Sequence, residues 1–447
     1  MKRLLFTIFC ILCCGVCNSA QIVNVEYIHK LIEQQYGITV PYNSDLTNPH
    51  VAANMKYLLT TIDAANSILN GEQITDYGTS EYATTVATDT DATLEMVRDH
   101  IRDYKFFATT TADTTSFSFS ISASGVFHID WGDGTRQSYR KTNTTATTYS
   151  HEYATAGEYV IKIGGYATGL YGWYATLSFA KNKNLAKIDG SLGAIFSTIK
   201  QKNGKLIQPN FRDVFNGCTN LTGPIPENLF KGVYGQPVSL MFYWTFLGCS
   251  SLTGAIPEGL FADIKGKPAS NLFNGTFNGT KITSVPENLF AGIVGPPANN
   301  MFYGTFRGCK LETIPSGLFA GISGPPAAGM FGLTFFENMK LKEIPAGIFA
   351  GISGPSANEM YDRTFGWCIN ATGTIPENLF GDIYGTAKTQ MFYHTFSNCS
   401  KLTGTSARIN GKYLYEIWPD ATGTQVQGMY RGATGLTDYA EIPSNWK

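Results

Sequence analysis

The sequence predicts an α/β repeat solenoid preceded by a small β-sandwich and an N-terminal helical region. In the second half of the chain, prolines recur every 29 to 31 residues. Between residues 106 and 172, apolar and polar residues alternate as in half-buried strands, and before residue 106 apolar residues recur at helical spacing. A chain of 447 residues is long enough for two or three such domains.

The charge balance argues against a nucleic-acid partner. Lys and Arg total 33 and Asp and Glu total 34, so the chain lacks the basic surplus that phosphate backbones attract. Charged residues make up 15% of the chain, aromatic residues make up 13%, and there are 47 glycines. This composition is typical of turn-rich extracellular proteins and excludes a largely disordered chain.

Residues 1–20 have the pattern of a secretory signal peptide. Lys2 and Arg3 are followed by an apolar stretch and by small residues up to Ala20, so the mature chain is expected to begin at Gln21. The alternatives are an uncleaved membrane helix, for which the apolar run is too short, and lipid attachment at Cys17, which Val16 disfavours. No later apolar run is long enough to cross a bilayer. We expect a secreted or cell-surface protein without a membrane span.

Residues 21–105 are predicted to be helical. Helices are expected over Val25–Tyr36, 49–70 and Asp91–Tyr104, and in the second of these Asn48 can cap and Pro49 fits the first helical position. Three amphipathic helices suggest a small bundle, a spacer, or a stalk through which the chain forms a homo-oligomer.

Residues 106–172 are predicted to form a β domain. Two motifs stand between its strands, the tight turn Asp130–Thr135 and the segment His151–Tyr153. Here the chain resembles PKD domains, the immunoglobulin-like sandwiches of surface proteins, whose WGDG turn and later H-x-Y it matches. The segment is shorter than such domains usually are, so one or two strands are expected to be missing or supplied by a neighbour.

Residues 175–447 form the repeat. Each unit is expected to contain a short extended segment, a proline turn, a Leu-Phe pair, a Gly-Pro loop and a second short helix. No single unit covers its own apolar residues, so neighbours must stack, with Phe246, Phe277, Phe306 and Phe335 as a buried ladder. The prolines and matching phenylalanines are Pro226, Pro257, Pro286, Pro315, Pro345 and Pro376, with Phe215, Phe246, Phe277, Phe306, Phe335, Phe365 and Phe396.

The run from Phe246 through Gly248-Cys249 and Leu252 to Ile256-Pro257 resembles the BspA-like leucine-rich repeats of bacterial and protist surface proteins. The resemblance implies an α/β leucine-rich-repeat solenoid. Because these units are longer than the family norm, it also implies more helix on the convex side.

The cysteines of the repeats are expected to be buried thiols. Cys218, Cys249, Cys309, Cys368 and Cys399 share one position of the unit, where Thr280 and Met339 stand in other units. Free Cys packs as a small apolar residue, and an odd count does not close a disulfide framework. A disulfide between Cys218 and Cys249 is the alternative.

No constellation favours catalysis, a cofactor or a metal. Asp130 and Asp133 could form a metal or acid-base site together with His128 and His151. Asp and Gly are also what a tight turn needs, so Ca²⁺ at Asp130 and Asp133 is only a weak candidate. Hydrolase, metalloprotease and phosphate-loop motifs do not occur in the sequence. We therefore expect a protein that is not an enzyme.

The best candidate for function is an extended surface. Residues beside the buried Leu and Ile of each strand point outward, and in the middle units they are charged: Lys310, Glu312, Lys340, Lys342 and Glu343. Tyr243, Tyr303 and Tyr393 could form a second strip suited to carbohydrate. The sequence thus favours a binding or adhesion protein that recognises a protein or a glycan on a host or neighbouring cell surface. The alternative is a structural surface-layer or oligomeric scaffold without a specific ligand.

Overall fold

The computed structural model describes residues 25–36, 39, 104–172 and 175–447. Residues 105–201 and 206–447 form one compact unit, and residues 1–104 with 202–205 form another. In the latter, helix α2 spans Val25–Tyr36, the range that the sequence predicts. The expected signal peptide and the helix over 49–70 lie outside the described residues. So does the helix over 91–104, apart from Tyr104, which begins a strand.

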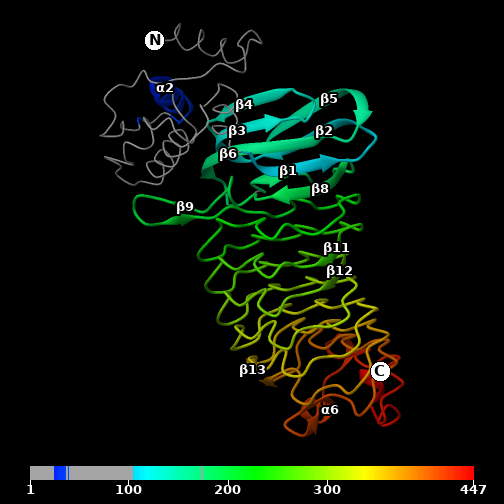
Figure 1. Cartoon of the computed structure of the whole chain (residues 1–447). Helices are drawn as coiled ribbons and strands as arrows, with labels where there is room; N and C mark the ends of the chain where they lie inside the picture. The colour runs from blue at the N-terminus through cyan, green and yellow to red at the C-terminus, as the bar shows by residue number, and fades with distance from the viewer. Residues whose placement is uncertain (1–24, 37–38, 40–103, 173–174) are drawn as a thin grey trace, which may run out of the picture. The chain divides into compact units, whose positions relative to one another are not determined.

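Two antiparallel sheets form the first part of the larger unit. One has the strand order β4-β3-β6-β1-β8 and the other β5-β2-β7 (Figure 1). The strands are β1 (Tyr104–Thr110), β2 (Thr114–Ile121), β3 (Ala123–Asp130), β4 (Arg136–Lys141), β5 (Thr147–Gly157), β6 (Val160–Leu170), β7 (Leu177–Ser178) and β8 (Leu185–Gly190).

The strands predicted from alternation are confirmed, and their apolar faces are buried. Phe117 and Phe119 of β2 and Phe127 and Ile129 of β3 are almost inaccessible to solvent. Strands β7 and β8 come from the chain beyond residue 172 and pair with β2 and β1. The segment that follows the sandwich therefore completes both of its sheets, as the short span of the β domain led us to expect.

The repeats form layers of turns laid side by side (Figure 1). The backbone alternates between two kinds of hydrogen bond, as one stretch shows. The amide of Phe242 donates to the carbonyl of Leu272 in the next layer at 3.0 Å, whereas the amide of Tyr243 donates three residues back to Leu240 at 3.1 Å. Trp244 then adopts a left-handed φ of 56°. An α-helix needs every amide to donate four residues back along right-handed backbone, so this stretch cannot be one.

The prediction of an α/β leucine-rich-repeat solenoid with a helical N-terminus is therefore wrong. Among the described residues, α-helix is limited to α2 and the four-residue α6 (Leu414–Ile417), so the expected helices of the convex side are not there. The sheets are small and mostly antiparallel. Between repeats, parallel pairing is limited to β11 (Thr253–Ala255) with β12 (Lys281–Ser284), β13 (Ser353–Pro355) with β14 (Asp382–Tyr384), and five isolated bridges. No continuous parallel sheet runs along these layers.

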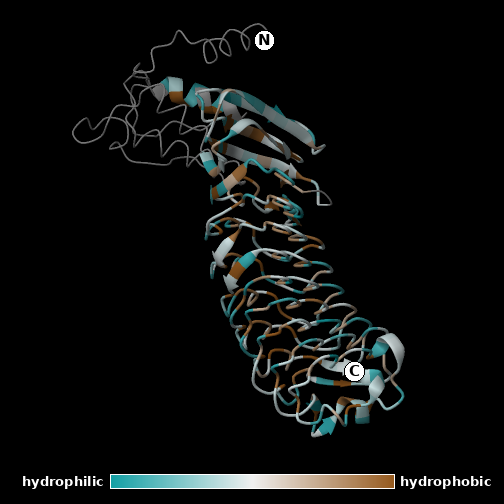
Figure 2. Cartoon of the chain, turned by 90° about the vertical axis from the view of Figure 1, so that its right-hand side faces the viewer, coloured by the Kyte–Doolittle hydropathy of each residue, from teal (hydrophilic) through white to brown (hydrophobic). Residues whose placement is uncertain are grey.

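Aromatic rings form columns through the layers. Phe246, Phe277, Phe306 and Phe335 are fully buried and stack with ring centroids 5.7, 5.7 and 5.8 Å apart, so the predicted ladder is confirmed. A second column passes through Phe242, Phe273, Phe302 and Phe331, with spacings of 5.7 Å. Figure 2 shows hydrophobic residues recurring in successive layers. These columns supply a core that no single layer could form.

The five repeat cysteines are buried and unpaired. Each thiol lies near a carbonyl of the preceding layer, as Cys249 Sγ does 3.0 Å from Phe215 O. Asn338, rather than Met339, takes this position in its layer, because its Nδ2 donates to Phe306 O at 2.8 Å. Met339 is one residue further on and exposed, so its assignment to the cysteine position is wrong.

The remaining elements are short. They are the hairpin of β9 (Ile199–Lys200) with β10 (Leu206–Ile207), the hairpin of β15 (Arg408–Ile409) with β16 (Lys412–Tyr413), and the 3-10 turns η1 (Gly423–Gln425) and η2 (Ser444–Trp446). At the end of the stack, Tyr430 continues the first aromatic column by lying 5.9 Å from Phe396.

Candidate functional site

The charged residues predicted on the strand face lie at the surface of adjoining layers. Glu312, Lys340, Lys342 and Glu343 are exposed, and Lys310 is half-buried. We call these five residues the strand face. The buried residues beside them, such as Leu311 and Leu341, point into the core. The segments 310–313 and 340–343 are not strands in the structure, so the strands expected there are absent, but the charges beside Leu311 and Leu341 face outward as the sequence predicts.

Glu312 and Lys342 join two layers of the strand face. The amide of Lys342 donates to Glu312 O at 3.0 Å, and its Nζ lies 2.6 Å from Glu312 Oε2. The hydrogen bond and the charge of Lys342 lower the pKa of Glu312, with a smaller contribution from Lys340. Both side chains are more than half exposed, and such surface pairs contribute little to stability.

The three tyrosines predicted as a second strip are half-buried. Arg212 lies over the ring of Tyr243 at 5.4 Å, and Arg363 lies over the ring of Tyr393 at 4.6 Å. Burial raises the pKa of Tyr243 and of Tyr303. Arg212 and Arg363 belong to the layers before Tyr243 and Tyr393, so these two rings contact a neighbouring layer.

Asp130 and Asp133, the weak calcium candidates, are bound to groups of the protein itself. Asp130 is buried, and its Oδ2 lies 3.1 Å from Arg136 Nε and 3.7 Å from Lys162 Nζ. Asp133 Oδ2 lies 2.6 Å from His151 Nε2. Burial raises the pKa of Asp133, but hydrogen bonds from His151 and Thr135 outweigh it and bring the pKa below its ordinary value. Positive neighbours at these distances disfavour a bound cation.

The same segment builds a compact aromatic network. The ring of His151 stacks on Trp131 with centroids 5.2 Å apart, and Tyr153 Oη donates to Trp131 O at 2.9 Å. The motif residues Trp131, His151 and Tyr153 thus hold the turn after β3 against β5. His128, the fourth member of the possible metal or acid-base site, bonds to Ser138 at 2.8 Å.

A surface hollow that sequence reasoning missed lies across four consecutive layers near the end of the stack. Its volume is about 400 Å³, and it is lined by Trp367, Arg363, His394, Asn398 and Arg431, with Phe336 and Ser397. Trp367 is 45% exposed. One feature of the sequence could have pointed to this hollow. Several units contain a Gly-Cys pair, and in one unit Trp367 replaces the glycine before Cys368.

Two interactions hold Arg363 in this hollow. Its Nη1 lies 2.9 Å from Oδ2 of the buried Asp362, and its guanidinium lies over the Tyr393 ring. Burial lowers the pKa of His394, and the positive charges of Arg363 and Arg431 lower it further. The hollow therefore carries two guanidinium groups and an imidazole that is neutral at neutral pH.

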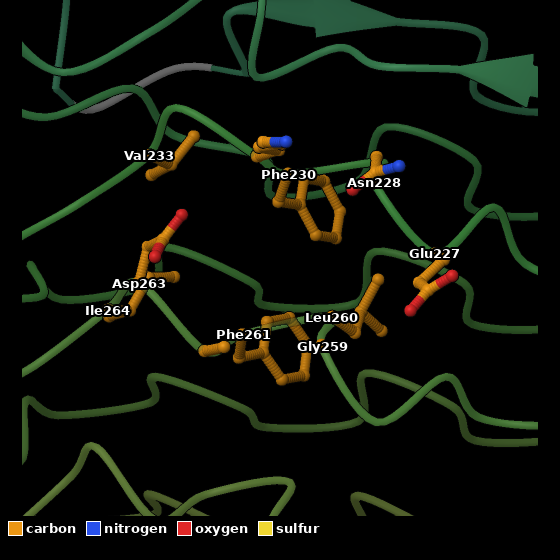
Figure 3. Close-up of a pocket in the computed structure, with 11 residues that line it drawn as sticks. Glu227, Asn228, Phe230, Val233, Gly259, Leu260, Phe261, Asp263 and Ile264 are labelled. Atoms are coloured by element: carbon orange, nitrogen blue, oxygen red, sulfur yellow. The ribbon is translucent and has the colours of Figure 1, made fainter.

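A second hollow of about 200 Å³ lies between two earlier layers (Figure 3). Its walls are core residues, including Phe230 and Phe261, whose rings stack at 5.9 Å. Glu227 and Asp263 lie at its opposite ends (Figure 3). Since its polar groups do not converge, this hollow has no arrangement suited to catalysis or to specific binding.

Two further findings bear on partners and metals. Of the helices that the structure describes, none combines the length and the apolar character that a bilayer crossing needs. Within the described ranges, no three residues of the types His, Cys, Asp and Glu gather as metal ligands would. Comparison with family models, curated proteins and solved structures finds no match for this chain.

Proposed function

We propose that this chain is a secreted or cell-surface recognition protein that binds a protein or a glycan through its strand face, without catalysing a reaction. The observation that carries the proposal is the placement of its five charged residues. They come from adjoining layers, and the amide of Lys342 bonds to Glu312 of the layer before it. Such a surface presents charges of both signs at fixed separations, which suits a ligand longer than one repeat.

The charges of this face are not needed to build the core. The Glu312–Lys342 pair is solvent-exposed, and exposed pairs contribute little to stability. In other layers the positions of Glu312 and Lys342 are held by Thr222, Thr253, Thr283 and Thr372, which are also exposed. At these two positions a partner explains why the middle layers carry Glu312 and Lys342 in place of threonine.

The placement outside the cell rests on the sequence of residues 1–20. A positive start, an apolar stretch and small residues before Gln21 form the pattern of a cleaved signal. Buried, unpaired thiols are compatible with an oxidising compartment, because their carbonyl contacts and burial keep them from oxidants.

The test is a screen of the chain from Gln21 against protein and glycan arrays, followed by measurements on two variants. In the first, Lys310, Lys340 and Lys342 are replaced by Ser. In the matched control, Lys231, Lys265 and Lys267, which are exposed in earlier layers, are replaced by Ser. We expect the first variant alone to weaken binding and to reduce its dependence on salt. Equal affinity in both variants would exclude the strand face, and concentration-dependent assembly without any ligand would favour a scaffold.

A further inference from the structure

We propose that the hollow around Trp367 binds an acidic saccharide, that is, a pyranose ring carrying a carboxylate or a sulfate. We call this hollow the Trp367 site. Its volume of about 400 Å³ lies within the range of small-ligand sites. The inference goes beyond the proposed function, because none of its lining residues belongs to the strand face.

Trp367 offers the apolar surface that such a ligand needs. With 45% of its surface exposed, it is one of the few large hydrophobic residues of the described chain that face solvent. The face of an indole ring is electron-rich, and the C–H groups on one face of a pyranose ring are weakly positive, so the two surfaces stack favourably.

The backbone at Trp367 shows that folding does not explain this residue. Its φ is 61°, in the left-handed region that a bulky side chain enters only at a cost. In five other layers this position is held by glycine (Gly217, Gly248, Gly279, Gly308 and Gly432), and in two by the polar residues Glu337 and Asn398, which also have a positive φ. The fold therefore accepts glycine here, and an exposed tryptophan in its place indicates a role at the surface.

The two arginines supply the anion specificity. Both contacts of Arg363 to Asp362 are made by Nη1, which leaves the second amino group of the guanidinium for a ligand. Arg431 is exposed, and we find no ion pair for it within the described part of the chain. Planar guanidinium groups bind carboxylate and sulfate oxygens through two parallel hydrogen bonds. None of the seven residues that line the Trp367 site is acidic.

The polar rim fits a sugar better than a nucleic acid. Asn398 lines the site beside the nearly buried Ser397, whose Oγ accepts from Asn398 Nδ2 at 3.3 Å, and the amide oxygen of Asn398 can accept from ring hydroxyls. A nucleic acid also combines a stacking ring with anions. Its binding depends on many basic residues, and this chain has 33 against 34 acidic ones.

The test uses the chain from Gln21 and three oligosaccharides of one backbone: a hexuronic acid oligomer, its carboxyl-reduced neutral form, and that neutral form after sulfation. Calorimetry should show the acidic oligomer, the sulfated one, or both binding more tightly than the neutral form. Trp367→Gly should weaken binding of the preferred oligomer by about tenfold or more, as truncation of a central aromatic contact does. Arg431→Gln should remove the preference for the charged forms.

Matched variants separate a loss of binding from a loss of folding. Trp367→Gly restores the residue found in five other layers, and its thermal transition shows whether it folds. Trp244→Gly is the control, because Trp244 also has a left-handed φ and the next layers carry Gly275 and Gly304 there. The Lys231, Lys265 and Lys267 variant, whose residues line neither the Trp367 site nor the strand face, should bind as the parent does. The assignment fails if the neutral form binds equally well, if Trp244→Gly weakens binding as much as Trp367→Gly, if a single-stranded oligonucleotide binds more tightly, or if no oligosaccharide binds.

Discussion

The carboxylate of Asp362 lies 2.9 Å from Arg363 Nη1 while only 3% of its side chain is exposed. Burial raises the pKa of Asp362 to about 7, although the positive charge of Arg363 acts in the opposite direction. One side of this ion pair is therefore embedded in the stack, and the other faces the Trp367 site.

Asp362 should make stability depend on pH. Between about pH 4 and pH 7 the folded chain holds a proton on Asp362 that the unfolded chain has released, so the free energy of unfolding falls as the pH rises. Asp362→Asn has no such proton. Its stability relative to the parent should therefore rise by about 1 to 4 kcal/mol from pH 4 to pH 7.5, measured by urea unfolding at both values. Asp420→Asn, at an exposed position, is measured alongside as the control, and a flat difference for Asp362→Asn would contradict the raised pKa.

Phe306 should be among the most sensitive positions of the stack. Its ring is fully buried between Phe277 and Phe335, so Phe306→Ala opens a cavity and should cost about 3 to 5 kcal/mol in chemical denaturation. Val294→Ala, in the adjoining layer and 55% exposed, is the control and should change stability by less than about 0.5 kcal/mol. Similar losses in both variants would show that Phe306 is not a core residue.

A buried threonine that recurs in six layers should stabilise the stack through its hydroxyl; these residues are Thr245, Thr276, Thr305, Thr334, Thr364 and Thr395. Thr334 Oγ1 lies 2.8 Å from Phe302 O of the preceding layer and 2.8 Å from Phe331 O of its own. Thr334→Val keeps the shape and removes the donor, so we expect a loss of about 1 to 2 kcal/mol by thermal unfolding. The exposed Thr313→Val should be nearly neutral, and a neutral Thr334→Val would contradict this role.

The repeat thiols should be protected and unpaired. Burial raises the pKa of Cys309 and of Cys399 to about 12, so little thiolate exists at neutral pH. In the chain from Gln21, a thiol reagent without reductant should react slowly under native conditions and should count five thiols in denaturant. A count of three would instead reveal one disulfide.

The period of the repeat and the positions that face the core could be predicted from the sequence. Pro and Phe recur with a nearly constant spacing, and equivalent residues of stacked layers must then share a column. This reasoning was enough to place the Phe246 ladder in the interior and Glu312 and Lys342 at the surface. It also predicted the alternation of β2 and β3, because a two-residue period is visible along a single strand.

The hydrogen bonds that the repeats make could not be predicted from the sequence, because they depend on the neighbouring layer. Phe242 and Phe246 are four residues apart, a spacing that a helix and this chain of turns share, so their pattern could not separate the two. The choice depends on the neighbouring layer, whose carbonyls at Leu272 and Thr276 accept the amides that a helix would use internally. The Trp367 site depends on the structure for the same reason. Arg363, His394 and Arg431 belong to different layers, and only stacking brings residues about thirty positions apart to one surface.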